Sequence, residues 1–152
     1  MMSGEEGERI VVLLAMAPES TGFPGILACL ETLGLDLAVV SDCRGVRREL
    51  RATNPSVVIT GVTLCDGNWC DVLSYVVDSQ AAASVVVYSQ EIDERLRSEA
   101  ILRGAYDLIS GPVSASQLRR CIEEAHHFRQ ETPPEKFMPE TRLPPPARER
   151  IS

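Results

Sequence analysis

The stretch ITGVTLCDGNW, residues 59–69, holds side chains that could act as nucleophiles or accept a phosphoryl group. Asp66 supplies a carboxylate there, Thr60 and Thr63 supply hydroxyls, and the more distant Ser89 supplies another. A hydroxyl needs a general base or a cation to become a nucleophile, and the sequence places neither beside these three. Asp66 lies in an Asp-Gly pair, which is typical of a tight turn. We interpret all four as structural residues, with phosphoacceptor roles as the alternative.

Five cysteines, at positions 29, 43, 65, 70 and 121, could support thiol chemistry. A reactive thiol needs a lowered pKa, which a nearby cation can provide. Cys65 and Cys70 have no lysine, arginine or histidine close in sequence, whereas Cys43 precedes Arg44. An odd count in a chain of this length is typical of reduced thiols in a cytoplasmic protein. We prefer packing thiols as the interpretation, with a redox switch at Cys65 and Cys70 as the alternative.

Two adjacent histidines, His126 and His127, are the remaining candidates for metal ligands. Neighbouring positions on one helix point in different directions, so the pair cannot complete a metal site. Near the end of a helix a positive charge complements the dipole, and we expect both side chains to be solvated. The sequence therefore indicates no metal and no cofactor.

Composition and charge narrow the classes of function. The chain has 152 residues, 44% of them hydrophobic, which is enough for one folded domain. A net charge of -7 argues against a nucleic-acid-binding surface. The run IVVLLAMAPES follows an acidic leader, which indicates a first strand and not a signal peptide, and no apolar run reaches the roughly 20 residues that cross a bilayer. We expect a cytoplasmic protein that binds neither nucleic acid nor membrane.

Five short runs of β-branched and aliphatic residues alternate with helical patterns. The runs are IVVLLA (10–15), LDLAVV (35–40), SVVITG (56–61), SVVVYS (84–89) and YDLIS (106–110). Several of them are apolar throughout, as in parallel strands buried on both faces. This alternation predicts an α/β fold with a doubly wound parallel sheet, helices on both faces, and a functional crevice at the carboxyl ends of the strands.

The ends of the chain differ from its centre. We expect a flexible N-terminus over residues 1–8, a folded domain over 9–130, and a Pro-rich disordered tail or linker over 131–152. The tail has six prolines in its 22 residues and no periodic apolar face, so it cannot bury enough surface to offset the entropy of ordering.

Three segments carry a resemblance to a known family. They are NPSVVITGVTLCDGNWCDVL, SVVVYSQ and RGAYDLISGPVS, and together they resemble the third strand with its loop, the fourth strand and the fifth strand of bacterial response-regulator receiver domains. The resemblance covers residues 9 to about 128. It implies a flavodoxin-like five-stranded sheet of order 2-1-3-4-5 and a cis peptide bond between Gly111 and Pro112.

The same resemblance indicates that the family's chemistry is missing. Receiver domains carry a phosphoacceptor aspartate at the tip of the third strand, two acids that hold a divalent cation, and a lysine that contacts the phosphoryl group. The matching positions here are Gly61, the pair Ala15 and Met16, and Gly111, and only Ser89 keeps its hydroxyl. Neutral groups can neither ligate magnesium nor stabilise a transferring phosphoryl group. The resemblance therefore implies a pseudo-receiver with no enzymatic activity.

Three further positions follow from the comparison with the family. We expect Met16 and Trp69 to close over the vacated crevice, because a thioether is flexible enough to fill an irregular gap. Leu108 stands at the family's aromatic switch position, so there is no ring to report phosphorylation.

We therefore predict a phosphorylation-independent module that binds a partner protein in bacterial signal transduction. The family's fourth helix, fifth strand and fifth helix form a dimer and output face, and the matching face here mixes glutamates with arginines that suit a homodimer. Those arginines are Arg95, Arg97, Arg103, Arg119 and Arg120. An exposed Trp69 is a second candidate contact. The alternatives are a sensor that binds a small ligand in the emptied crevice or responds through Cys65 and Cys70, and an unconventional enzyme.

Overall fold

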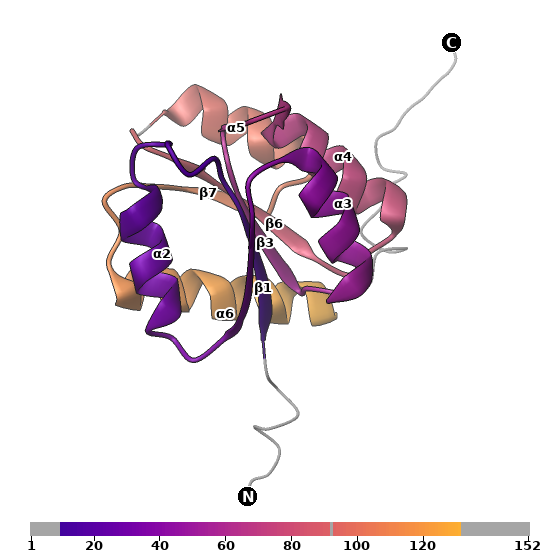
Figure 1. Cartoon of the computed structure of the whole chain (residues 1–152), viewed down its shortest axis with the longest axis horizontal. Helices are drawn as coiled ribbons and strands as arrows, with labels where there is room; N and C mark the ends of the chain where they lie inside the picture. The colour runs from indigo at the N-terminus through magenta and orange to yellow at the C-terminus, as the bar shows by residue number, and fades with distance from the viewer. Residues whose placement is uncertain (1–9, 92, 132–152) are drawn as a thin grey trace, which may run out of the picture.

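The computed structural model describes residues 10–91 and 93–131 (Figure 1). Its main strands are β1 (Val11–Ala15), β2 (Asp36–Val40), β3 (Val57–Gly61), β6 (Ser84–Ser89) and β7 (Asp107–Ser110). Its helices are α2 (Phe23–Glu31), α3 (Cys43–Ala52), α4 (Trp69–Ser79), α5 (Glu94–Leu102) and α6 (Ala115–Glu131). The predicted N-terminal segment 1–8 lies outside the described residues, as does the predicted tail 131–152 except for its first residue. That residue, Glu131, is the last residue of α6.

All five main strands pair in parallel, in the order β2-β1-β3-β6-β7. In chain order of the sheet strands this is 2-1-3-4-5, so the predicted flavodoxin-like fold is confirmed. The central strands are apolar on both faces because helices cover both, and every residue of β3 and β6 is buried. The peptide bond between Gly111 and Pro112 is cis, as predicted.

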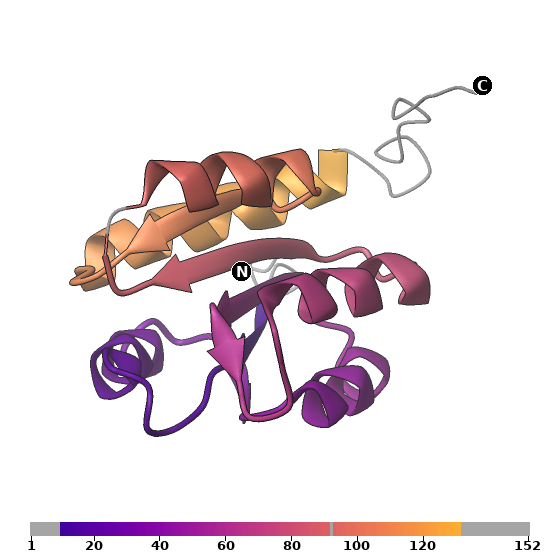
Figure 2. The same cartoon turned by 90° about the horizontal axis from the view of Figure 1, so that it is seen from above.

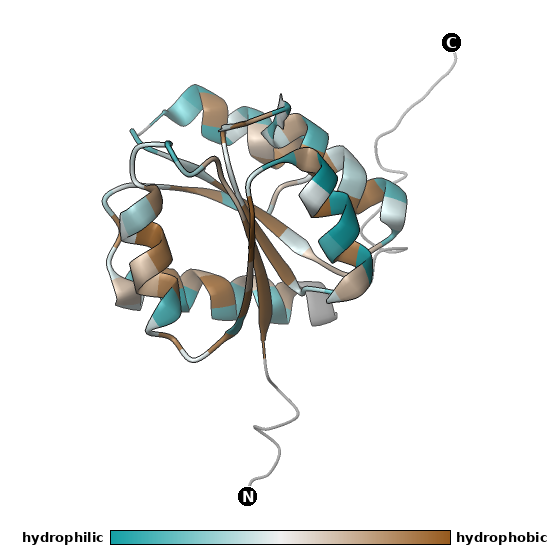
Figure 3. Cartoon of the chain, in the orientation of Figure 1, coloured by the Kyte–Doolittle hydropathy of each residue, from teal (hydrophilic) through white to brown (hydrophobic). Residues whose placement is uncertain are grey.

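Helices lie on both sides of the sheet (Figure 2), and two apolar layers hold them against it. One layer packs α2 and α6 on one face, with Leu14, Ile59 and Leu118 fully or almost fully buried. The other packs α3, α4 and α5 on the opposite face around Leu13, Val58 and other core side chains. Figure 3 shows hydrophobic residues concentrated along the central strands and hydrophilic ones on the outer turns of the helices. No described helix has the length and apolar character needed to span a membrane.

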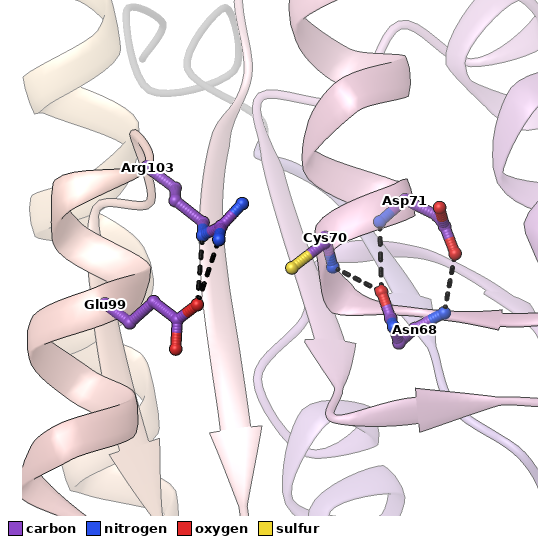
Figure 4. A network of polar contacts seen from close by, with 5 residues as sticks. All are labelled: Asn68, Cys70, Asp71, Glu99 and Arg103. Atoms are coloured by element: carbon purple, nitrogen blue, oxygen red, sulfur yellow. Dashed lines mark hydrogen bonds and ion pairs between the residues drawn. The ribbon is translucent and has the colours of Figure 1, made fainter.

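A small hairpin that the sequence did not predict follows β3. It consists of β4 (Thr63–Leu64) and β5 (Gly67–Asn68), which pair antiparallel. Its last residue, Asn68, caps α4: the side chain accepts hydrogen bonds from the backbone N–H groups of Cys70 and Asp71, at 2.9 and 3.3 Å, and Asp71 accepts one back from Asn68 at 3.0 Å (Figure 4). This capping box satisfies N–H groups that have no partner inside the helix, so it fixes where α4 begins.

Candidate functional site

The carboxyl ends of the strands meet at one edge of the sheet, because the strands are parallel. Ala15 lies beside Thr60 in the register, Gly61 lies beside Tyr88, and Ser89 lies beside Ser110, which precedes Gly111. The structure therefore brings the predicted positions 15, 16, 61, 89 and 111 to the same edge. This is the place where doubly wound proteins usually bind their ligands.

Met16 fills the space next to Gly61. The Met16 side chain is 2% exposed. A β-carbon placed on Gly61 would lie 3.1 Å from Met16 Cγ and 3.8 Å from its Cε, so any larger residue at position 61 requires Met16 to move. The prediction that Met16 closes over this end of the sheet agrees with this packing.

Tyr88 occupies the other half of the crevice, a role that the sequence analysis missed. Its side chain is 4% exposed. A β-carbon on Gly22 would lie 2.6 Å from Tyr88 Oη, and a β-carbon on Gly111 would overlap that oxygen. The hydroxyl therefore sits between the loop that precedes α2 and the end of β7. Burial raises the pKa of Tyr88, so the group stays neutral.

Gly22 and Gly111 both lie against the Tyr88 hydroxyl, which leaves no space for a side chain at either position. Gly22 also has φ of 92°, a left-handed conformation that L side chains rarely adopt. As long as the Tyr88 ring keeps its position, even a β-carbon at position 111 would clash with the Tyr88 hydroxyl. The sequence did contain a signal for this packing: Tyr88 lies near the end of an apolar strand, where a buried ring requires small residues around it.

The residues at the ends of β1 and β3 offer no anionic group that could hold a cation. Ala15, Met16 and Gly61 contribute a methyl group, a thioether and a hydrogen. The hydroxyl of Ser89 donates to the carbonyl of Glu91 at 2.8 Å, and the buried hydroxyl of Thr60 donates to the carbonyl of Gly61 at 2.9 Å. Across the part of the chain that the structure describes, no group of three His, Cys, Asp or Glu side chains could hold a metal ion.

Asp66 is committed to the start of α3. Its Oδ1 accepts a hydrogen bond from the backbone N–H of Cys43 at 2.7 Å, while Asp42 accepts one from the N–H of Gly45 at 2.8 Å. These carboxylates satisfy N–H groups at the positive end of the helix dipole. The geometry agrees with the interpretation of Asp66 as a structural residue, and it ties the hairpin to the loop before α3.

The cysteines near this edge are free thiols. Cys43 is buried, and burial followed by the hydrogen bond to Asp66 raises its pKa to about 12. A thiol with so high a pKa is a poor nucleophile, so Arg44 does not activate it. Cys65 is exposed in the turn of the hairpin, and Cys70 is half-buried in the first turn of α4.

Trp69 does not fulfil either expectation from the sequence. It is 5% exposed, so it offers no exposed hot spot. It packs with Leu64 and Val72 in the core layer beneath α3, α4 and α5, whereas Met16 belongs to the layer on the opposite face. The reason is the hairpin: it turns the chain so that the Trp69 N–H bonds the carbonyl of Val62 at 3.1 Å and the ring points inward. Tyr88, and not Trp69, accompanies Met16.

The predicted partner face, made by α5, β7 and α6, carries both paired and unpaired charges. Arg97 Nε lies 3.0 Å from Asp107 Oδ1 and joins α5 to β7, and Arg103 lies 3.1 Å from Glu99 one turn earlier on α5 (Figure 4). Arg95, Arg119 and Arg120 are exposed and pair with no acid among the described residues. Leu108 is a buried residue of β7 beneath this face.

His126 is not solvated, which corrects the expectation from its position in the sequence. It is 5% exposed, and its Nδ1 lies 2.9 Å from the hydroxyl of Ser56, at the start of β3. The neighbouring Ala125 is fully buried against the sheet, so this turn of α6 faces inward. His127 is exposed, as expected.

Comparison with known proteins defines the fold and no more. No family profile matches the sequence, and no curated protein sequence matches it. Solved structures do match. A response-regulator receiver domain protein from Clostridium thermocellum superposes with a TM-score of 0.68 at 22% identity, over 80% of this chain and 98% of that one. The receiver domain of Francisella response regulator 1452 gives 0.68 at 17% identity, over 79% and 98%.

A third structure, the beryllofluoride-activated NtrC4 receiver domain dimer, gives a TM-score of 0.68 at 20% identity, over 78% of this chain and 98% of that one. The chain therefore has the fold of receiver domains.

Because Tyr88 and Gly111 fit closely, substitutions at these two positions should have non-additive effects on the free energy of unfolding. Gly111→Ala should lower the free energy of unfolding by about 1–3 kcal/mol, because the new methyl group overlaps the tyrosine hydroxyl. Tyr88→Phe removes that oxygen, so the double variant should recover most of the loss in urea unfolding. Gly25→Ala is the matched control, because nothing lies within 4 Å of its β-carbon. Equal costs of Gly111→Ala in both backgrounds would contradict the fit.

Asp66 predicts a pH dependence of stability. The hydrogen bond from the Cys43 N–H lowers the pKa of Asp66 below its ordinary value of 3.8. The carboxylate then stabilises the fold above the unfolded pKa, and this contribution disappears as the pH falls through the lower, folded pKa. Asp66→Asn keeps the shape and loses the charge. Urea unfolding over about pH 5 to 3 should therefore show a flatter slope of stability against pH in the variant than in the wild type; identical slopes would argue against this role.

Proposed function

We propose that this protein is a pseudo-receiver, which acts without phosphorylation by binding a partner protein in bacterial signal transduction, in the cytoplasm. The observation that carries the proposal is the filled crevice. Met16 packs on Gly61 and the Tyr88 hydroxyl lies against Gly22 and Gly111, where receiver domains need a carboxylate, a cation and a lysine. Without those groups at positions 15, 16, 61 and 111, this end of the sheet lacks what receiver domains use to hold a phosphoryl group.

The same occupancy argues against the alternatives. A small ligand placed against Gly61 or Gly111 would have to displace Met16 or Tyr88, at the cost of their packing. Thr60 and Ser89 use their hydroxyls in local hydrogen bonds, and Asp66 caps α3. Burial and the hydrogen bond to Asp66 raise the pKa of Cys43, which makes it a poor nucleophile. We therefore propose no catalytic role for this chain.

The face of α5, β7 and α6 is the proposed contact for the partner. The ion pair between Arg97 and Asp107 holds α5 against β7, and exposed Arg119 and Arg120 lie on α6 next to exposed Glu123. Unpaired charges of both signs on a firm surface favour a contact made of reciprocal ion pairs, either with another protein or across a two-fold axis with a second copy. The solved NtrC4 receiver dimer is an example of a structural neighbour that assembles with itself.

Photo-crosslinking in the native cell tests this proposal. A photoreactive residue at position 120 should give a discrete crosslinked protein, and Arg119→Glu should reduce its yield about tenfold by reversing a charge at the contact. The same photoreactive residue at position 78, exposed on α4, is the matched control. A product that contains only this chain identifies a homodimer. Equal products from both positions, or none from position 120, would overturn the assignment of this face.

A further inference from the structure

The β2 strand forms one edge of the sheet, and no described residue pairs with its outer side. The N–H of Asp36 donates to the carbonyl of Ile10 at 3.1 Å, and the carbonyl of Val40 accepts from the N–H of Met16 at 3.0 Å. In a parallel ladder, alternate residues bond to the same neighbour. The even-numbered residues of β2 therefore bond to β1, and Leu37 and Val39 direct their backbone N–H and C=O groups outward.

This edge lies at the base of two hollows. One, of about 310 Å³, is lined by Leu37 and neighbouring residues of β2. The other, of about 390 Å³, lies beside Met16 and is also lined by Val39, by Phe23 of α2, and by Arg44 and Arg48 of α3. Figure 1 shows α2 and α3 on opposite sides of the sheet at this edge. The hollows follow the strand along its length, and Val39 is 43% exposed there.

The hollow at the carboxyl end of β2 is positively charged. Arg44 and Arg48 lie one turn apart on α3 and both line it. Within the described ranges, Arg44 pairs with no acid, and Arg48 reaches only its neighbour Glu49, at 3.7 Å between exposed side chains. Such an exposed pair contributes little. Asp42 also lines the hollow, but its carboxylate is engaged by the N–H of Gly45. In a chain with a net charge of -7, this patch is suited to an acidic ligand.

We propose that the β2 edge binds an extended, acidic segment of a partner protein, which adds a strand to the sheet. The outward groups of Leu37 and Val39 would pair with the backbone of that segment, and small apolar side chains would cover Val39. Acidic side chains would meet Arg44 and Arg48. A second copy of this chain fits less well for two reasons. Its α2 and α3 would have to enter the space beside β2, and its Arg44 and Arg48 would approach the same arginines of the first copy.

This inference deepens the proposed protein-binding function but uses a different surface from the face of α5, β7 and α6. Two interfaces on one module would let it connect two proteins. If no peptide binds at the β2 edge, the proposed contact at the face of α5, β7 and α6 is unaffected, and the control variant below distinguishes the two surfaces.

Residue-resolved hydrogen exchange by NMR tests the proposal. The probe is a short blocked peptide that alternates valine with glutamate. At saturation, exchange at the amides of Leu37 and Val39 should slow by about tenfold or more, because they gain partners in a new strand. The amides of Asp36, Ala38 and Val40 should change little, since they already bond to β1. This alternation distinguishes strand addition from a ligand that merely fills the hollows.

Charge reversal supplies the second arm. The double variant Arg44→Glu and Arg48→Glu should weaken peptide binding about tenfold or more. The matched control, Arg95→Glu with Arg119→Glu, changes two exposed arginines on the other face and should leave the affinity unchanged. The proposal is overturned if millimolar peptide protects neither Leu37 nor Val39, or if the control variant weakens binding equally. Protection that depends on protein concentration without peptide would instead identify a second copy as the occupant.

Discussion

Two large side chains and three glycines fit together at the carboxyl ends of the strands, and the proposed function depends on that fit. Met16 rests on Gly61, and the Tyr88 hydroxyl lies between Gly22 and Gly111. Each glycine leaves the volume that its neighbour fills, so a side chain at any of the three glycines would require Met16 or Tyr88 to move. Packing at this density resists the insertion of even one methyl group.

This packing makes the carboxyl ends of β1 and β3 apolar, with Met16 against Gly61. Clustered carboxylates repel one another and raise each other's pKa, a cost that a bound cation relieves. Neutral residues carry no such cost, so the edge is stable without a ligand. The acids that do lie nearby, Asp42 and Asp66, satisfy N–H groups at the start of α3. The two contacts that we propose therefore lie on the surface: the mixed charges over α5, β7 and α6, and the outer side of the β2 edge.

The sequence predicted the elements and their order because these follow from local patterns. Continuous apolar runs mark buried parallel strands, and the resemblance to receiver domains supplied the order that the structure confirms. Residues at strand ends were also placed correctly, since parallel strands bring their carboxyl ends together. Met16 could be predicted to pack inward because a thioether beside a glycine has a space to fill.

The errors have two causes: a hairpin too short to show a pattern, and contacts between segments far apart in the chain. Trp69 looked like an exposed loop residue because the β4–β5 hairpin has only two residues in each strand, too few to show a periodic pattern. His126 is buried because its turn of α6 meets Ser56, a residue 70 positions away. Tyr88 was missed because its space is created jointly by Gly22 and Gly111, which no local pattern connects.

The most direct measurement is an NMR titration of the whole chain with magnesium and then beryllofluoride, which reports on the amides of Met16, Gly61, Tyr88 and Gly111. A crevice filled by Met16 and Tyr88 should leave these four resonances unchanged at millimolar ligand. Saturable shifts at Gly61 and Gly111 would show that the crevice opens and holds both ions, and would contradict the account.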